Sequence, residues 1–305
     1  MAAHDAAASQ HYPQGALYVV ATPIGNLADI SLRALHVLQL ADTVACEDTR
    51  HTQQMLRSYG IEKHGHQLLA VHQHNEAEAA QTVLQRLHQG ERVAYASDAG
   101  TPGISDPGAR LVAAVGAAGL RCIPLPGASS VTALLSVTGL VPVSGSAGDG
   151  GHGGFEFAGF LPSRAQERAL ALQALQTTRH AVVLLEAPHR MEATAQALAA
   201  LGERRVTLGR ELTKQFEQVT TLPAQELPQW FAADAHRLRG EFALVVHPAA
   251  AQATAGEQGA HVLRLLLPEL PLKTAARLAA EITGASRNDL YALGLKMKKD
   301  DQPEG

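Results

Sequence analysis

The stretch RVAYASDAGTPGISDPG, residues 92–108, decides the fold class of this chain of 305 residues. Its first five residues are mostly apolar, as is typical of a buried strand, and a helical pattern follows over 111–118. The twelve residues 97–108 hold three Gly, two Pro and two Asp. Such a loop costs conformational entropy and buries little apolar surface, so its place after a strand predicts that it holds a ligand.

The order of strand, turn and helix recurs on both sides of this stretch. Apolar runs predict further strands at 17–22, 43–46, 121–124, 156–160, 180–185, 205–208, 216–220 and 241–246. Helical patterns are found at 32–38, 51–59, 77–88, 128–137, 166–176, 191–201 and 225–233. Short strands that alternate with helices indicate βαβ units and mostly parallel sheets, with an antiparallel element near 211–221. Such sheets bind ligands at the carboxyl ends of their strands.

Two polar residues are expected to begin helices. Ser31 precedes a helical stripe of leucines, and Asn75 is followed three residues later by Glu78, which is the spacing of a capping box.

A glycine-rich segment at 143–154 marks the boundary between two halves of the chain. We expect an α/β fold with these parts: a disordered tail at 1–14, an N-terminal α/β domain at 15–142, the linker at 143–154, a C-terminal α/β domain at 155–248 and a helical appendage at 260–305. The appendage carries the basic residues Lys273, Arg277, Arg287, Lys296, Lys298 and Lys299.

Composition excludes several classes of protein. With 46% hydrophobic and 18% charged residues the chain is globular rather than disordered, and its net charge of −4 argues against a general coat for nucleic acids. Two cysteines cannot form a disulfide framework or a four-ligand zinc site. No apolar run reaches the ~20 residues of a membrane span, and no signal peptide pattern begins the chain, so we expect a cytoplasmic protein with no membrane partner.

The turns at the strand ends are the candidate ligand site. One turn is Pro23-Ile24-Gly25 and another is Pro126 to Ser130. Neither matches the dinucleotide fingerprint, and the chain has no Walker A motif. Charged side chains crowd three further strand ends, at 46–50, 184–190 and 209–214, where they form either solvated ion pairs or ligand contacts. His72, His74 and Glu76 share the spacing of one strand face, but we expect no metal site.

Seven segments occur together in a characteristic order. They are 17–31 (LYVVATPIGNLADIS), 47–52 (EDTRHT), 97–108 (SDAGTPGISDPG), 124–130 (PLPGASS), 157–162 (FAGFLP), 186–190 (EAPHR) and 210–214 (RELTK). Together they resemble the branch of the tetrapyrrole (corrin/porphyrin) methylase superfamily that methylates small-subunit ribosomal RNA. The resemblance implies two α/β domains of tetrapyrrole-methylase type with S-adenosylmethionine in the cleft between them, a small C-terminal helical appendage, and a homodimer. It also implies 2′-O-methylation of a cytidine ribose in the decoding region of 16S rRNA, on the RNA or the small ribosomal subunit.

The resemblance also implies a set of site residues. Those expected to bind the cofactor are Pro23, Ile24, Gly25, Asp98, Ala99, Gly100, Thr101, Pro102, Ser105, Pro126, Ser129, Ser130, Leu185 and Glu186. The candidates for the proton acceptor are Glu47, Asp48, Glu186, His189, Glu211 and Lys214, and an ion pair of Glu47 with Lys214 is preferred. Arg50, Arg190 and Arg210 are expected to hold RNA phosphates. The chain departs from the usual pattern at Ser129-Ser130, which adds a hydroxyl, and in the insert at 143–154.

Two other functions stay open at this point. The first is methylation of a tetrapyrrole or another small molecule, and the second is a ribosome-assembly factor without enzymatic activity.

Overall fold

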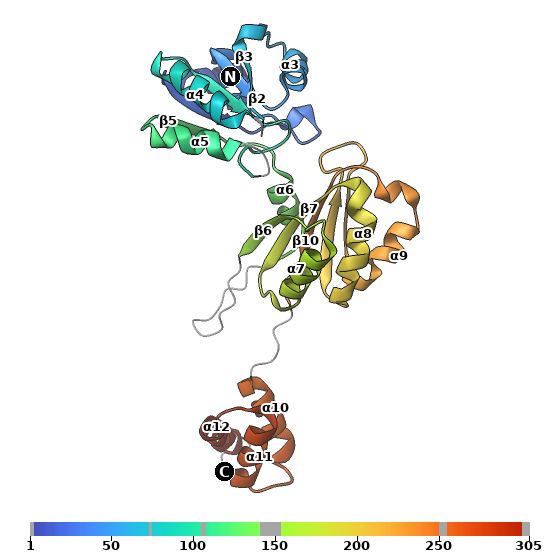
Figure 1. Cartoon of the computed structure of the whole chain (residues 1–305). Coiled ribbons are helices and arrows are strands. Elements are labelled where there is room, and N and C mark those ends of the chain that lie inside the picture. The colour runs from blue at the N-terminus through green and yellow to red at the C-terminus, as the bar shows by residue number, and fades with distance from the viewer. Residues whose placement is uncertain (1–2, 73–74, 105–107, 141–153, 250–254, 301–305) are drawn as a thin grey trace. The chain divides into compact units, whose positions relative to one another are not determined.

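The computed structural model describes residues 3–72, 75–104, 108–140, 154–249 and 255–300. By its internal contacts the chain divides into two compact units, Met1–Pro248 and Ala249–Gly305. Within these described ranges, the first unit holds two five-stranded sheets and the second holds three helices (Figure 1).

The first sheet is entirely parallel, in the strand order β3-β2-β4-β1-β5. Its strands are β1 (Ala16–Val20), β2 (Thr43–Cys46), β3 (Leu68–Ala70), β4 (Val93–Ala96) and β5 (Arg121–Leu125). Val20 pairs with both Ala96 and Leu125, and Cys46 pairs with Ala96. Four strands therefore end at the same level, and the loops that follow them meet at one edge of the sheet.

Helices cover this sheet on both faces. They are α2 (Leu32–Leu40), α3 (Thr49–Ser58), α4 (Glu76–His88) and α5 (Gly108–Ala117), with the short 3-10 turns η1 (Leu27–Asp29) and η2 (Gly65–Gln67). Successive residues of β1 belong to different cores: Tyr18 packs with Leu38 of α2, whereas Leu17 packs with Val83 and Leu111 of α4 and α5. Burial on both faces explains why these strands are apolar throughout.

The second sheet is mixed, in the order β6-β7-β10-β8-β9, and only β6 and β7 pair in parallel. Its strands are β6 (Phe155–Phe160), β7 (Ala181–Glu186), β8 (Arg205–Arg210), β9 (Gln218–Pro223) and β10 (Phe242–Val246). The helices of this part are α6 (Ser130–Ser136), α7 (Ala165–Thr177), α8 (Pro188–Leu198) and α9 (Leu227–Ala232), with the turns η3 (Ala199–Leu201), η4 (Ala224–Glu226) and η5 (Ala235–Leu238).

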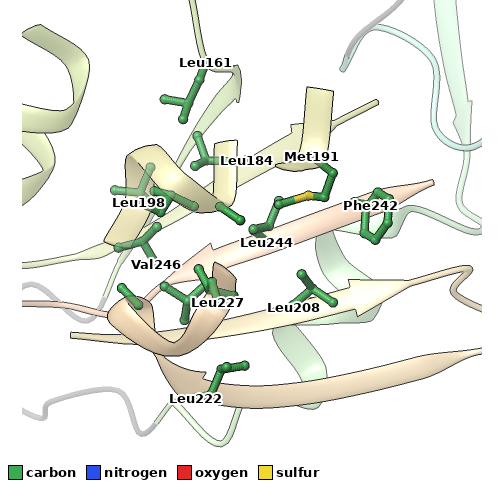
Figure 2. Close-up of a cluster of buried hydrophobic side chains, with 14 of the residues drawn as sticks. Leu161, Leu184, Met191, Leu198, Leu208, Leu222, Leu227, Phe242, Leu244 and Val246 are labelled. Carbon is green, nitrogen blue, oxygen red and sulfur yellow. The ribbon is translucent and has the colours of Figure 1, made fainter. Parts of the chain in front are cut away.

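Two cores cover the faces of the second sheet. On one face Met191 and Leu198 of α8 pack on Leu184, Leu208 and Leu244 (Figure 2). On the other face α6 packs through a separate group of side chains, Val131 and Leu134 with Val183, Ala243 and Val245. Because α6 follows β5 directly, the chain passes from the first sheet onto the second at the carboxyl edge of the first.

The second unit consists of α10 (Ala255–Leu266), α11 (Leu272–Thr283) and α12 (Arg287–Asp300). Its core is built from Leu263, Leu290 and three alanines of α11. A Cβ on Gly294 would lie 2.3 Å from Leu272 Cδ1, so a residue without a side chain lets α11 and α12 approach closely. None of the helices in the described ranges is long and apolar enough to cross a lipid bilayer.

Most predicted strands and helices are confirmed. The prediction that Ser31 begins a helix is also confirmed, because its hydroxyl accepts a hydrogen bond from Ala34 N at the start of α2. The antiparallel element near 211–221 is the β8–β9 pair. Asn75 forms no capping box: its carboxamide accepts from His72 N and donates to Ala70 O, so it fastens the end of β3 instead.

The structure corrects three further expectations. In place of a disordered tail it has α1 (Ala3–Ala8), and the buried Tyr12 donates a hydrogen bond to Ala7 O. The strand β3 was not predicted, because three residues give no recognisable alternation. The helical appendage begins at Ala255, five residues before the expected start. The expected linker at 143–154 lies almost wholly outside the described residues.

Candidate functional site

Two loops of the first sheet are joined by a short antiparallel bridge between Thr22 and Gly100. Thr22 N donates to Gly100 O over 2.9 Å, and Gly100 N donates back to Thr22 O over 3.1 Å. Gly100 has a φ of +85°, and a Cβ there would lie 3.2 Å from Ile24 Cγ2. Glycine is therefore required at this position both by the backbone conformation and by the close approach of Ile24.

A third loop is fastened to the first two. The Thr101 hydroxyl donates to Ala128 O over 3.0 Å. Gly127 lies so near the end of β1 that a Cβ would be 2.9 Å from Ala21 Cβ and 3.3 Å from Ala21 O. The loops after β1, β4 and β5 are thus fastened to one another, and we call these three loops the loop junction.

Acidic side chains fix the start of α3 beside this junction. The Asp48 carboxylate accepts from Arg50 N and His51 N, and these backbone hydrogen bonds lower the pKa of Asp48. Asp48 N in turn donates to the Asp98 carboxylate over 3.2 Å. Asp98 therefore links the end of β4 to the start of α3.

Lys214 connects the loop after β8 to the first sheet. Its aliphatic chain lies over Gly25, where a Cβ would be 2.3 Å from Lys214 Cγ. Its Nζ donates to Glu211 Oε1 and to Glu241 Oε2, each over 2.9 Å. Glu211 and Thr213 have φ values of 52° and 67°, which is uncommon for residues other than glycine. This strain places Lys214 against Gly25.

The ion pair changes the ionisation of both partners. Burial alone lowers the pKa of Lys214, but the hydrogen bonds with Glu241 and Glu211 outweigh burial and raise it. Burial alone raises the pKa of Glu211, but hydrogen bonds from Glu241 N and Lys214 outweigh burial and lower it. Lys214 therefore remains a cation at neutral pH.

These shifts predict the pH dependence of the stability that the pair contributes. We expect Lys214→Met to lower the free energy of unfolding by about 1 kcal/mol, because both side chains are partly exposed. Ionised Glu211 adds to the free energy of unfolding above its ordinary pKa of about 4.3, and this contribution is lost as the pH falls through its lowered pKa in the folded protein. Protonated Lys214 adds to the free energy of unfolding below its ordinary pKa of about 10.4, and this contribution is lost as the pH rises through its raised pKa in the folded protein. Urea unfolding of both proteins should show a constant difference between about pH 5 and pH 10. A difference that varies between pH 6 and 9 would contradict this assignment.

A second charged group lies at the end of β7. The Glu186 side chain is only 1% exposed, and its Oε1 lies 3.1 Å from Arg190 Nε. Its Oε2 accepts from the Thr194 hydroxyl over 2.6 Å, and Ala187 N donates to Oε1. Arg190 also donates to Leu161 O. All of these contacts are internal, so the pair fixes the end of β7 to α8.

Two cavities adjoin the loop junction. The first, which we call the α3 cavity, has a volume of about 460 Å³. Its lining residues are Pro23, Ile24, Gly25, Leu27, His51, Gln54, Met55, Ser58, Asp98, Ala99 and Lys214. The second, the strand-end cavity, has a volume of about 300 Å³. Its lining residues are Ile24, Ala99, Ser130, Phe160, Leu185, Glu186, Ala187, Pro188, Leu212, Glu241, Phe242 and Ala243. Both volumes fall in the usual range for sites that hold small molecules, and Ile24 and Ala99 line both cavities.

The structure sorts the fourteen residues expected to bind the cofactor. Those on the wall of one or both cavities are Pro23, Ile24, Gly25, Asp98, Ala99, Ser130, Leu185 and Glu186. Gly100 and Thr101 hold the loop junction together. Pro102, Pro126 and Ser129 line neither cavity, and Ser105 lies outside the described residues.

Sequence reasoning missed three polar residues of α3, namely His51, Gln54 and Ser58, which line the α3 cavity. Their spacing of three and four residues places them on one face of a helix, and this was the signal available.

The expected ion pair of Glu47 with Lys214 is wrong. Lys214 pairs with Glu211 and Glu241 instead, and a proton acceptor would need a lowered rather than a raised pKa. Glu47 Oε1 lies 3.5 Å from Asp98 N.

The arginines expected to hold RNA also differ from the prediction. Arg190 is occupied by Glu186, and Arg210 donates to the carbonyl oxygens of Arg239 and His236. Arg50 has an exposed side chain.

Two further features of the described residues are the state of the Cys46 thiol and the clustering of metal-ligating residue types. Burial raises the pKa of the Cys46 thiol to about 11, so the thiol stays protonated. Among the described residues, no three His, Cys, Asp or Glu side chains gather as a metal site.

Comparison with known proteins gives the class of this molecule. Residues 16–228 match the family of tetrapyrrole (corrin/porphyrin) methylases, and residues 253–298 match the RsmI C-terminal HTH domain. The chain belongs to the tetrapyrrole methylase family.

Within that family the chain is similar to proteins named ribosomal RNA small subunit methyltransferase I. The one from Pseudomonas aeruginosa is 47% identical over 92% of this chain and 97% of its own length. The one from Neisseria meningitidis is 44% identical over 97% of this chain and 98% of its own length. The one from Escherichia coli O157:H7 is 43% identical over 93% of this chain and 96% of its own length.

Solved structures share the fold at low sequence identity. Diphthine synthase superposes with a TM-score of 0.55 at 16% identity, covering 76% of this chain and 90% of its own. Cobalt precorrin-4 methyltransferase superposes with a TM-score of 0.53 at 17% identity, covering 78% of this chain and 98% of its own. At these identities the likenesses show the fold alone.

Proposed function

We propose that this chain transfers a methyl group from S-adenosylmethionine to the ribose 2′-hydroxyl of a cytidine in the decoding region of 16S rRNA, in the cytoplasm. Relatives similar over nine tenths of both lengths are named for methylation of small-subunit ribosomal RNA. The observation that carries the proposal is the pair of cavities that share Ile24 and Ala99 as lining residues, because a group transfer needs two neighbouring ligand sites.

The strand-end cavity fits the cofactor. Leu185, Leu212 and Phe242 offer apolar surface for an adenine ring, and Glu241, whose side chain is 75% exposed, places a carboxylate on the same wall. A carboxylate suits the sulfonium and ammonium groups of S-adenosylmethionine. When bound, the cofactor supplies a methyl group on a positively charged sulfur, which needs no further activation. The chain's own task is therefore to position the two ligands, which can contribute several kcal/mol.

The residues at the α3 cavity limit where the hydroxyl proton goes. Lys214 on the cavity wall is held as a cation, and the Asp48 carboxylate, which does not line the cavity, is occupied at the start of α3. Of the other side chains that line the cavity, His51 and Asp98 are of types that accept protons, so we assign the proton to one of them.

RNA contacts are assigned to positive charge outside the internal ion pairs. Arg50 lies at the start of α3, next to the cavity wall. In the second unit Lys273, Arg287 and Lys296 are exposed. The acidic total charge makes such local groups necessary for binding a polyanion.

Removing residues 249–305, the whole second unit, is expected to weaken binding to small ribosomal subunits and to flatten its dependence on salt, because phosphate contacts release counterions. A full-length variant with Lys273, Arg287 and Lys296 replaced by glutamine should shift in the same direction and reduce the slope by up to ~3. Filter binding at several salt concentrations measures both. Unchanged slopes would remove the second unit from the RNA interface.

The test of the function is a map of ribose methylation in 16S rRNA from cells with and without this protein. We expect one cytidine 2′-O-methyl group to be lost and to return when purified protein and S-adenosylmethionine are added to the deficient subunits. Methylation of tetrapyrroles instead would support a small-molecule methylase, and failure to bind S-adenosylmethionine would support an assembly factor.

We also propose a homodimer, consistent with the exposed Phe155 and Phe160 on the edge strand β6.

A further inference from the structure

One face of α3 forms a polar wall that the cofactor does not need. His51, Gln54 and Ser58 line the α3 cavity at intervals of three and four residues. Leu27 belongs to the same wall, is 47% exposed, and is held near α3 because the Tyr59 hydroxyl donates to Leu27 O over 2.6 Å. The cavity therefore combines hydrogen-bonding groups with apolar surface, as a site for a nucleobase requires.

The Gln54 carboxamide is available to a ligand. It is exposed and makes no hydrogen bond to any residue in the described ranges. Its neighbour Gln53 differs, because its carboxamide donates to Lys63 O. Of the two adjacent glutamines, one fixes α3 within the fold and the other faces the cavity.

Ser58 is restricted in what it can bind. Its hydroxyl donates to Gln54 O over 3.1 Å. Accepting a hydrogen bond from a ligand amino group leaves this bond intact, because the oxygen keeps its lone pairs. Donating to a ligand carbonyl oxygen would break the bond to Gln54 O, so an amino group is preferred at this place.

The positive charge beside the α3 cavity is that of Arg50. Its side chain is exposed at the start of α3, whereas Lys214 on the cavity wall is paired with Glu211 and Glu241. Asp98 is the one carboxylate among the residues that line this cavity, and it accepts a hydrogen bond from Asp48 N. An anionic polynucleotide is therefore favoured on the side of the cavity where Arg50 lies.

Resting on the function proposed above, we propose that the α3 cavity receives the target nucleoside and that Gln54 and Ser58 select its base. Gln54 offers a donor and an acceptor to the Watson–Crick edge, and Ser58 accepts from an exocyclic amino group. Cytosine carries such an amino group, whereas uracil carries a carbonyl oxygen in its place. The two side chains thus specify a cytidine rather than a uridine.

The experiment measures methylation of small ribosomal subunits that lack the modification, and of the same subunits with uridine in place of the methylated cytidine. Gln54→Leu is expected to lower kcat/KM for the cytidine subunits by about 10–100-fold, with affinity for S-adenosylmethionine unchanged. Ser58→Ala is expected to reduce the preference for cytidine over uridine by about tenfold. Gln85→Leu, on the exposed face of α4, is the matched control and should behave as the unaltered protein.

The outcomes distinguish this inference from the function on which it rests. If the unaltered protein methylates subunits and Gln54→Leu keeps its kcat/KM and base preference, the inference fails while the function stands. A loss of equal size in Gln85→Leu would also overturn it, because the effect would then not depend on the cavity. If the unaltered protein methylates no ribose in the subunits, the proposed function fails and takes the inference with it.

Discussion

Gly127→Ala is expected to lower the affinity for S-adenosylmethionine by about 100-fold, although it adds a single methyl group. The new Cβ would lie 2.9 Å from Ala21 Cβ and 3.3 Å from Ala21 O, at the end of a central strand that cannot move alone. The turn at 126–130 must therefore shift, and Thr101 follows because its hydroxyl donates to Ala128 O. A displacement of about 1 Å in a positioned site can cost about 100-fold. Calorimetric titration with the cofactor measures the change.

The matched control for this substitution is Gly116→Ala. Gly116 is exposed on α5, and a Cβ there meets nothing within 4 Å. Helix propensity predicts a gain of up to ~1 kcal/mol in the free energy of unfolding and no change in cofactor affinity. If Gly127→Ala binds the cofactor as tightly as Gly116→Ala does, the loop junction does not form the cofactor site.

The fold of the first unit was predictable because its signals are local. Buried parallel strands such as β1 and β4 are apolar along their whole length, and the glycines and prolines after them mark where they end. The position of β10 was not predictable in this way. It lies between β7 and β8 and is antiparallel to both, which depends on pairing across long sequence separations.

The site was predictable in part for the same reason. Turns such as Pro23-Ile24-Gly25 and Asp98-Ala99 carry their own sequence signature, and the structure places them on the cavity walls. The partners of charged side chains carry no such signature. Lys214 is held by Glu211, three residues away, and by Glu241, which reaches it only because β10 lies beside β8.

Arginine positions show the same limit. From sequence, Arg190 and Arg210 are charged residues at strand ends, and charge at a strand end suits a phosphate. Whether a guanidinium group faces a ligand or a neighbouring carbonyl depends on the packing of distant elements, such as η5 against Arg210.

Arg190→Leu is expected to lower the free energy of unfolding by about 3 kcal/mol, because it leaves the Glu186 carboxylate buried without its counter-charge. The Glu186 side chain is 1% exposed and would keep only Thr194 and Ala187 N as partners. Leu161 O would also lose its donor. Urea unfolding measures the loss. Arg164→Leu is the control, because it removes an ion pair with Glu167 at the surface. The side chain of Arg164 is 84% exposed and that of Glu167 is 54% exposed, so the free energy of unfolding should fall by less than ~1 kcal/mol.

A second substitution separates the cost of the unpaired charge from the loss of the arginine's packing. If the unpaired carboxylate causes the instability, Glu186→Leu added to Arg190→Leu should recover part of the lost stability, because the double variant buries no charge. If packing of the arginine chain causes it, the second change should destabilise the protein further. Recovery would show that the buried carboxylate without its counter-charge, rather than lost packing, causes the instability, and that an apolar pair at the end of β7 holds α8 at least as well as the single variant does.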